Sequence, residues 1–182
     1  MKLNLSLVLA GGTAVVAASA LLFSGPAPAQ VFGSHDSNAP VNFNAGRIEV
    51  QDRADRVVLS GAVRVDQAGM VLNSARMTVA YRNSGGIEID RIDASGGVTI
   101  RKAGDTATGN VAIYDLNRRL ITLIGNVTLT QGANRLSGGR VVIDLASGRS
   151  TIDGRSAGGS SVGTSDSGGR VSGTFTVPQQ KN

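Results

Sequence analysis

Hydrophobic and polar residues alternate in short segments between Pro40 and Pro178. Segments 48–51, 63–66, 77–80, 87–90, 98–101 and 127–130 each carry an apolar side chain at every second position. A period of two directs apolar side chains to one face of a β-strand and polar ones to the other. Turn sequences rich in Gly, Asn and Asp separate the segments, and no proline lies between the two named above. The pattern predicts an antiparallel sheet of many short strands.

Two sequence anchors recur along this stretch. The first is a small residue followed by alternating apolar positions, and it begins at Gly46, Ala75, Gly109 and Gly139. The second is Gly-x-Val, and it begins at Gly61, Gly96 and Gly125. A period of roughly 30 residues indicates stacked units that share one hydrophobic face. Glycines at fixed places in each unit predict bulges or tight corners where the sheet bends.

Composition agrees with a β protein and limits its chemistry. The chain has 25 glycines, and each glycine inside a helix would cost about 1 kcal/mol, which disfavours a helical fold. The absence of cysteine excludes disulfides, thiolate metal sites and a cysteine nucleophile. The single histidine, His35, excludes paired histidine ligands and most catalytic triads, and we expect it to be exposed. We therefore expect neither enzyme activity nor a cofactor.

Residues 1–29 have the pattern of an export signal. Lys2 precedes an uncharged run that ends at Phe23, and the small-residue triplet 27–29 fits an A-x-A cleavage site. Cleavage is therefore expected after Ala29. The alternative is an uncleaved membrane anchor, since the run exceeds a usual signal-peptide core of ~7–15 residues and a membrane span needs about 20. N-terminal sequencing of the exported protein separates the two.

Composition also divides the rest of the chain. Residues 147–182 are rich in Gly and Ser, whereas the alternating segments end before them. We expect a flexible segment at 30–40, one β domain at 41–153, a Gly/Ser-rich loop at 154–169, a final strand at 170–178 and a tail at 179–182.

The ordered series of anchors resembles the OstA-like family of periplasmic lipopolysaccharide-transport proteins. Residues 112–115 and 124–129 carry the resemblance best, and 41–45 and 60–65 match more loosely. It extends over residues 41–152, with a weaker match at 169–178 and extra residues at 83–93.

The resemblance implies an all-β, open half-jellyroll, a V-shaped sheet built from the ~30-residue repeats. It also implies a periplasmic bridge that binds the acyl chains of lipopolysaccharide, or a related glycolipid, in its apolar interior. The implied partners are an inner-membrane-anchored component and an outer-membrane translocon component of the same machine, with head-to-tail self-association. Unpaired edge strands would provide the docking surfaces.

The alternating apolar residues are the candidates for the lipid-binding groove. Because groove and dry core would share one face of the sheet, the sequence leaves these two roles open. Arginine suits bidentate phosphate contacts, so Arg76, Arg118 and Arg119 are candidates for a rim that meets lipid phosphates. The groove candidates are Ile48, Val50, Val63, Val65, Met77, Val79, Val98, Ile100, Val111, Ile113, Val127, Leu129, Val141 and Ile143.

Three other functions are less compatible with the sequence. An inner-membrane-anchored component of the same machine would keep its N-terminal segment. A carbohydrate-active enzyme on a β-helix would need clustered carboxylates, but the 13 acidic residues are scattered. A nucleic-acid binder would need a basic patch with stacking aromatics. The net charge of +5 is dispersed and aromatic residues make up 3% of the chain, so no nucleic acid partner is expected.

Overall fold

The computed structural model describes residues 32, 35–83, 85–154 and 169–176 of the 182-residue chain. They form one ten-stranded antiparallel sheet and one short 3-10 turn, η1 (Asp52–Ala54). The expected signal peptide at 1–29 lies outside the described residues, and no helix within them is long and apolar enough to cross a membrane. The strands are β1 (Asn42–Asn44), β2 (Arg47–Gln51), β3 (Arg56–Gln67), β4 (Met70–Asn83), β5 (Ile87–Lys102), β6 (Asp105–Asp115), β7 (Leu120–Gln131), β8 (Asn134–Asp144), β9 (Ser150–Asp153) and β10 (Ser172–Thr174).

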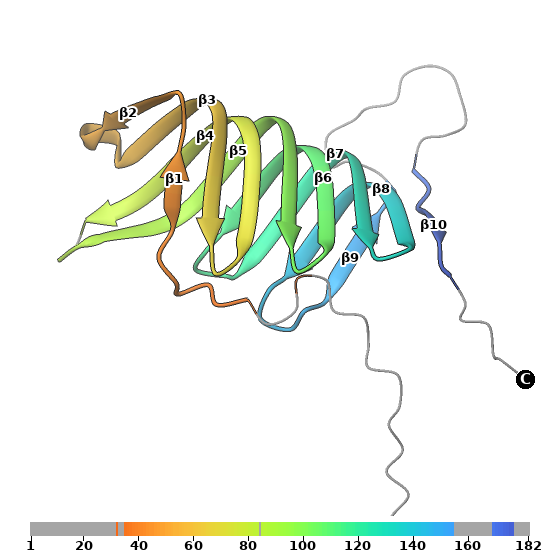
Figure 1. The fold of residues 1–182 in the computed structure, drawn as a ribbon. Helices are drawn as coiled ribbons and strands as arrows, with labels where there is room; N and C mark the ends of the chain where they lie inside the picture. The colour runs from red at the N-terminus through yellow and green to blue at the C-terminus, as the bar shows by residue number, and fades with distance from the viewer. Residues whose placement is uncertain (1–31, 33–34, 84, 155–168, 177–182) are drawn as a thin grey trace, which may run out of the picture.

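The sheet bends along one line, the crease, and folds into two layers (Figure 1). At the crease the register shifts between each pair of neighbouring strands from β3 to β8. In β3, β5 and β7 two consecutive residues with positive φ form the bend, and they oppose fewer residues on the neighbouring strand, which is a β-bulge. These pairs are Gly61–Ala62, Gly96–Gly97 and Gly125–Asn126.

Both sequence anchors lie on the crease. The Gly-x-Val anchors supply the bulges, and the first anchors lie at or beside the bends of the intervening strands. Between β1 and β2, Gly46 N–H donates a hydrogen bond of 2.8 Å to the carbonyl of Gly61. The prediction of an open, all-β half-jellyroll with glycine corners is confirmed. The expected short strands are joined in pairs through the bends, so the longest strand has 16 residues.

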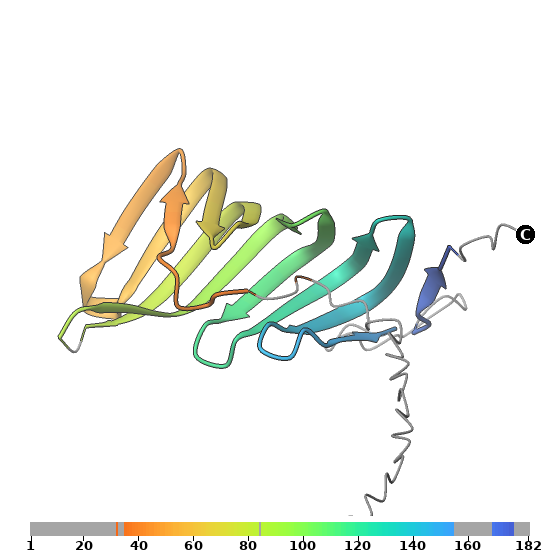
Figure 2. The same cartoon turned by 60° about the horizontal axis from the view of Figure 1, so that its bottom comes forward.

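Each layer contains one half of every long strand, and the hydrophobic core lies between the layers. Layer 1 comprises 42–44, 63–67, 70–73, 98–102, 105–108, 127–131, 134–138 and 172–174. Layer 2 comprises 47–51, 56–60, 76–83, 87–95, 111–115, 120–124, 140–144 and 150–153. Buried side chains of both layers, such as Ile100 and Met77, form one cluster. The turns opposite the crease form two free rims, and the side between these rims is the open side of the V (Figure 2).

Two neighbouring glycines at the crease of β5 allow a direct test of this packing. A Cβ added to Gly96 would lie 2.7 Å from Ala75 Cβ, whereas a Cβ on Gly97 would have no atom within 4 Å. Both residues have a positive φ, where an L-residue costs about 1–2 kcal/mol. We expect Gly97→Ala to lower the free energy of unfolding by this amount, and Gly96→Ala by a further ~1–3 kcal/mol because of overpacking. Urea unfolding measures both, and equal losses would contradict the described crease.

Candidate functional site

The inner face of the folded sheet holds most of the predicted groove residues. Ten of them are buried in the cluster between the layers: Val63, Val65, Met77, Val79, Val98, Ile100, Val127, Leu129, Val141 and Ile143. Ile48 and Val50 lie opposite Leu59 and Val57, on the same face. They are 53% and 60% exposed because β2 is an edge strand. These twelve side chains therefore share one apolar face, which is a packed core at its centre.

Val111 and Ile113 lie on the outer face of β6, and the expectation that they face the interior is corrected. Ala112 and Tyr114 are the buried residues of this segment. All four are apolar or aromatic, so alternation alone did not define the inner face. In β6, Asn110 and not Gly109 occupies the position across the crease that Ala75 has in β4.

An apolar cavity of about 130 Å³ opens at the β1–β2 end of the folded sheet. Layer 1 contributes one side chain to it, and layer 2 contributes the others. Two large hydrophobic side chains at its border, Ile48 and Ile87, are more than half exposed. An apolar opening of this kind suits a hydrocarbon chain. The lining residues are Phe43, Ile48, Val57, Leu59, Val79, Tyr81, Ile87 and Ile89.

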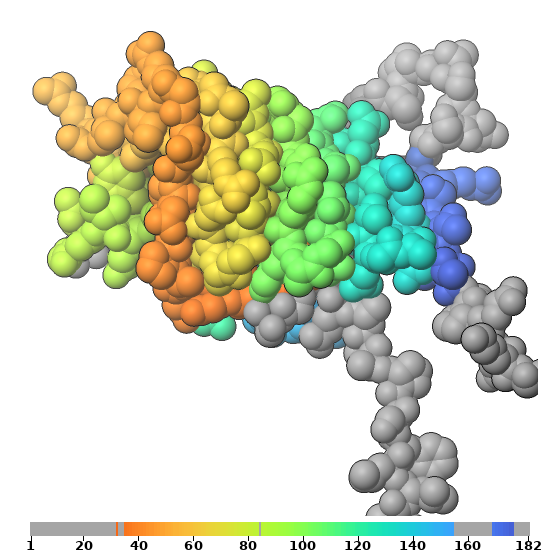
Figure 3. Space-filling model, in the orientation of Figure 1, coloured from red at the N-terminus to blue at the C-terminus, as the bar shows by residue number. Residues whose placement is uncertain are grey.

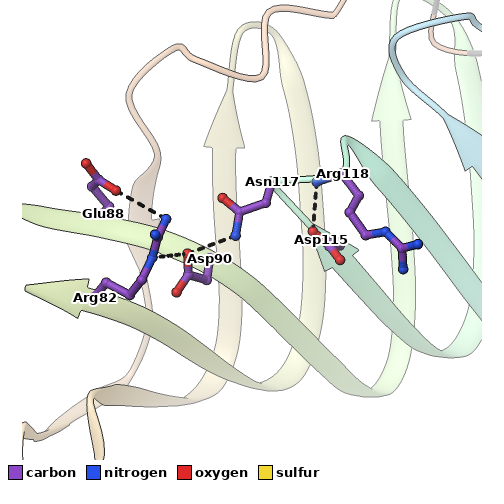
Figure 4. Close-up of polar contacts among 6 residues, drawn as sticks. All are labelled: Arg82, Glu88, Asp90, Asp115, Asn117 and Arg118. Carbon is purple, nitrogen blue, oxygen red and sulfur yellow. Dashed lines mark hydrogen bonds and ion pairs between the residues drawn. The ribbon is translucent and has the colours of Figure 1, made fainter.

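The β4–β5 hairpin that forms one wall of this cavity is clamped by polar contacts on its other side (Figure 4). Arg82 lies 3.2 Å from a carboxylate oxygen of Glu88 and 2.7 Å from one of Asp90. Asn117, in the turn between β6 and β7, donates a 2.9 Å hydrogen bond to Asp90. This bond and Arg82 hold the pKa of Asp90 below its usual value. The contribution to stability is present at neutral pH and is lost as the pH falls through the lowered pKa.

The three arginines proposed as a phosphate rim do not gather. Arg118 and Arg119 lie in the turn between β6 and β7, on the rim of layer 2. Arg76 lies beside the crease in β4, at the end of layer 2 that is opposite to its rim. It is exposed there and acts electrostatically on Glu49. Only two of the three are therefore placed at the open side of the V.

A segment before β1, Phe32 with residues 35–41, lies along the open side and is called the strap here (Figures 1 and 2). It falls within the stretch expected to be flexible. Phe32 N–H donates a 3.0 Å hydrogen bond to the carboxylate of Asp105. The Gln67 amide donates two bonds of 3.0 Å, to the carbonyls of Ser37 and Ala39. The strap is thus fixed to layer 1 by two side chains.

The same glutamine joins the two layers. Tyr114 in layer 2 donates a 2.8 Å hydrogen bond to Gln67 Oε1, and His35 Nε2 lies 3.1 Å from that oxygen. Because an amide oxygen only accepts, Nε2 carries the imidazole proton. Burial lowers the pKa of His35, so the ring is neutral at pH 7, and it raises the pKa of the Tyr114 phenol. His35, expected to be exposed, is half-buried in this contact.

Sequence reasoning missed this polar group. Gln67 and Asp105 lie at inner positions of β3 and β6 that apolar residues would normally occupy. A polar side chain in the inward phase is a detectable signal, because a buried polar group needs a partner. The partner was not detectable, since Tyr114 lies 47 residues from Gln67 in the sequence.

Comparison with known proteins identifies the family of this chain. The family described as LptA/(LptD N-terminal domain) LPS transport protein matches residues 42–149, more than half of the chain. The chain belongs to this family. The members of this family are transport proteins. The matched residues extend from the beginning of β1 to the turn before β9.

Two individual proteins are similar to this member of the family. An uncharacterized protein of Rhizobium meliloti (strain 1021) is 27% identical over 159 residues, 84% of this chain and 86% of that protein. A crystal structure has a TM-score of 0.65 and 19% identity, and it covers 78% of this chain and 99% of its own. It is LptH, described as the LptA-homologous periplasmic component of the conserved lipopolysaccharide transport device from Pseudomonas aeruginosa. The fold is therefore that of an LptA-like protein.

Proposed function

We propose that this chain is a periplasmic bridge that binds the acyl chains of lipopolysaccharide between its two layers and passes the lipid from the inner to the outer membrane. The observation that carries the proposal is the continuous apolar inner face, which opens into the cavity at the β1–β2 end. Membership in a family of lipopolysaccharide transport proteins supports it. In this role the chain carries out no chemistry on the lipid.

Hydrophobic burial provides the affinity for such a ligand. Removing one methylene from water is worth roughly 0.8 kcal/mol, so a few acyl chains can be held strongly. Most inner side chains from β2 to β8 are aliphatic, apart from Gln67, Asp105 and Tyr114, which favours comparable affinity along the length of the face. A lipid can then move without meeting a deep trap. The sequence contains no G-x-x-x-x-G-K-[ST] motif, so the energy for direction would come from another component.

The edge strands are the proposed contacts with partners. β1 and β2 border the two layers at one end, and β10 and β9 border them at the other. Their outer backbone groups have no strand partner within the described residues, and a strand of another protein can pair with them. The partners would be an inner-membrane-anchored component, an outer-membrane translocon component and further copies of this chain. Export through a signal peptide cleaved after Ala29 would deliver the protein to the periplasm.

Site-specific photo-crosslinking tests the binding face. We expect a photoreactive residue at Val79 or Leu129 to capture lipopolysaccharide about tenfold more than one at Ile113 or Thr128, because the first pair faces the interior and the second pair faces outward. Capture is measured by lipopolysaccharide immunoblotting after irradiation of cells that express each variant. The two outward positions are controls on the same strands or their neighbours. Equal capture from both faces, or none from either, would refute the proposed function.

A further inference from the structure

Phe32 fills a place in the hydrophobic interior although it belongs to no strand. Its side chain is 1% exposed and is part of the cluster formed by the inner faces of both layers. Strand pairing in the sheet begins at β1, and Phe32 precedes this strand. Its position therefore depends on the strap and not on backbone pairing. A phenyl ring buried among aliphatic side chains occupies the kind of space that a hydrocarbon chain would take.

The apolar free space in the interior is small while the strap is in place. A larger cavity of about 480 Å³ lies between the strap and the rim of layer 2, but its lining is mainly polar and includes Arg82, Glu88 and Asn117. The apolar cavity at the β1–β2 end measures about 130 Å³. Ligand pockets in proteins typically measure roughly 300–1,000 Å³. The remaining inner side chains pack against one another. Acyl chains therefore require that some part of the molecule leave the interior.

The strap, Phe32 with residues 35–41, is joined to the sheet by side-chain contacts and by no strand pairing. Its hydrogen bonds to the sheet's polar side chains involve the carboxylate of Asp105, the amide of Gln67 and, through His35, the hydroxyl of Tyr114. One of its own buried polar atoms, His35 Nδ1, has no hydrogen-bond partner. A buried polar atom without a partner is unfavourable relative to the same atom in water. The strap thus places Phe32 in the interior, while its residues 35–41 stay on the open side and retain a buried polar atom without a partner.

The polar groups that hold the strap are unusual for this interior. Within the described residues, Gln67, Ser74 and Asp105 are the polar side chains classed as buried, and two of the three bind the strap. Ser74 instead bonds to the carbonyl of Arg76 in its own strand. An all-apolar inner face would pack the layers equally well, so these two residues point to a specific role in seating the strap.

We propose that the strap is a displaceable occupant of the lipid-binding interior. Phe32 holds the place of an acyl chain, Gln67 and Asp105 keep the strap on the open side, and lipopolysaccharide displaces it when the acyl chains insert. This inference rests on the proposed function and adds its regulation, since a protein without lipid would not expose its apolar interior to the periplasm.

A tryptophan in place of Phe32 reports the displacement directly. The chain has no other tryptophan, so the fluorescence of Phe32→Trp comes from this position alone. We expect blue-shifted emission that acrylamide quenches poorly in the lipid-free protein, and a red shift with at least threefold stronger quenching after purified lipopolysaccharide is added. Co-sedimentation with radiolabelled lipopolysaccharide measures binding in the same samples. Binding without a change in emission would overturn the strap, and absence of binding would overturn the proposed function with it.

Removal of the Phe32 side chain provides a second, independent test, in which the affinity for lipopolysaccharide is measured. If the strap occupies the interior about 90% of the time, its loss raises the apparent affinity about tenfold. Phe32→Ala is therefore expected to bind lipopolysaccharide about 3- to 10-fold more tightly. Phe175→Ala removes the same ring from an exposed position beyond β10 and should leave affinity unchanged. Unchanged or weaker binding by Phe32→Ala would contradict competition between strap and lipid.

Hydrogen exchange of the unsubstituted chain covers the case in which a variant folds poorly. Lipopolysaccharide is expected to accelerate exchange of the Phe32 amide at least tenfold, because displacement breaks its bond to Asp105. Amides in the centre of β4 and β7 should become slower in the same sample. Slower exchange at Phe32 as well would mean that lipid stabilises the strap, which is the opposite of the proposal.

Discussion

Replacing Ile121 by aspartate is expected to lower the melting temperature by about 10 °C or more, or to prevent folding. The same replacement at the next residue, Thr122, is expected to leave the melting temperature within about 2 °C. Ile121 is 0% exposed in layer 2, opposite Tyr114 and Ile143. A carboxylate there would be buried without a partner, which costs about 4 kcal/mol or more. In a chain of this size each kcal/mol corresponds to roughly 2–4 °C.

Thr122 provides a control because it is the next residue of the same strand and its side chain lies on the opposite face of the sheet. It lies opposite Ile113 and Val142 on the outer face, and it is only partly buried. Both variants add one negative charge to β7 at adjacent positions. Thermal unfolding followed by circular dichroism measures the two melting temperatures. Similar losses from both variants would mean that the inner and outer faces of layer 2 are not distinguished as the structure describes.

The overall architecture could be predicted because three independent patterns agree. Period-two alternation predicted strands, the regular spacing of the anchors predicted stacked units, and the glycines within them predicted the bends. Positive φ at Gly61, Gly96 and Gly125 explains why glycine recurs there. The wide unit at 83–93 is a long β4–β5 hairpin with an additional register shift between Ala80 and Tyr81. Each of these features depends on residues close together in the sequence, so the sequence alone predicts it.

The errors arose where the sequence had no local signal. At the bend of β6 the inward phase shifts by one residue, from Ala107 and Gly109 to Ala112 and Tyr114. Because the apolar residues of this segment occur in both phases, the shift could not be detected. The same shift occurs in β4, between Ser74 and Met77, but there the polar Arg76 and Thr78 mark the outer positions directly after the bend. Where apolar residues occupy consecutive positions, the sequence does not show which of them face the interior.

The strap and the clamp on the β4–β5 hairpin could not be predicted for a different reason. Both depend on side chains that are distant in sequence, such as Asn117 and Asp90, or Gln67 and Ser37. Such pairs meet only after the sheet has folded. The space-filling view shows one face of the folded molecule, where strands from β1 to β8 form a continuous outer surface and strap residues follow its lower border on the β1 side (Figure 3). Long-range polar contacts of this kind are determined by the folded sheet and leave no pattern in the local sequence.

Replacing Ile89 by aspartate is expected to weaken lipopolysaccharide binding at least tenfold with a smaller effect on folding. Ile89 lines the cavity at the β1–β2 end, opposite Tyr81, and it is only partly buried. A carboxylate at this position would stay hydrated and would prevent acyl methylenes from contacting the wall. Loss of contact with two methylenes corresponds to about 1.6 kcal/mol, which is slightly more than a factor of ten in affinity.

Two controls separate the apolar contact from charge. Thr122→Asp adds the same charge on the outer face and should bind lipopolysaccharide as the unsubstituted chain does. Ile89→Asn introduces a polar group of the same shape as aspartate without the charge, and it should lose most of the same affinity. Fluorescence anisotropy of labelled lipopolysaccharide measures all four proteins. If Ile89→Asn binds normally while Ile89→Asp does not, charge repulsion and not hydrophobic contact governs the opening. If both bind normally, lipid does not enter the interior at the β1–β2 end.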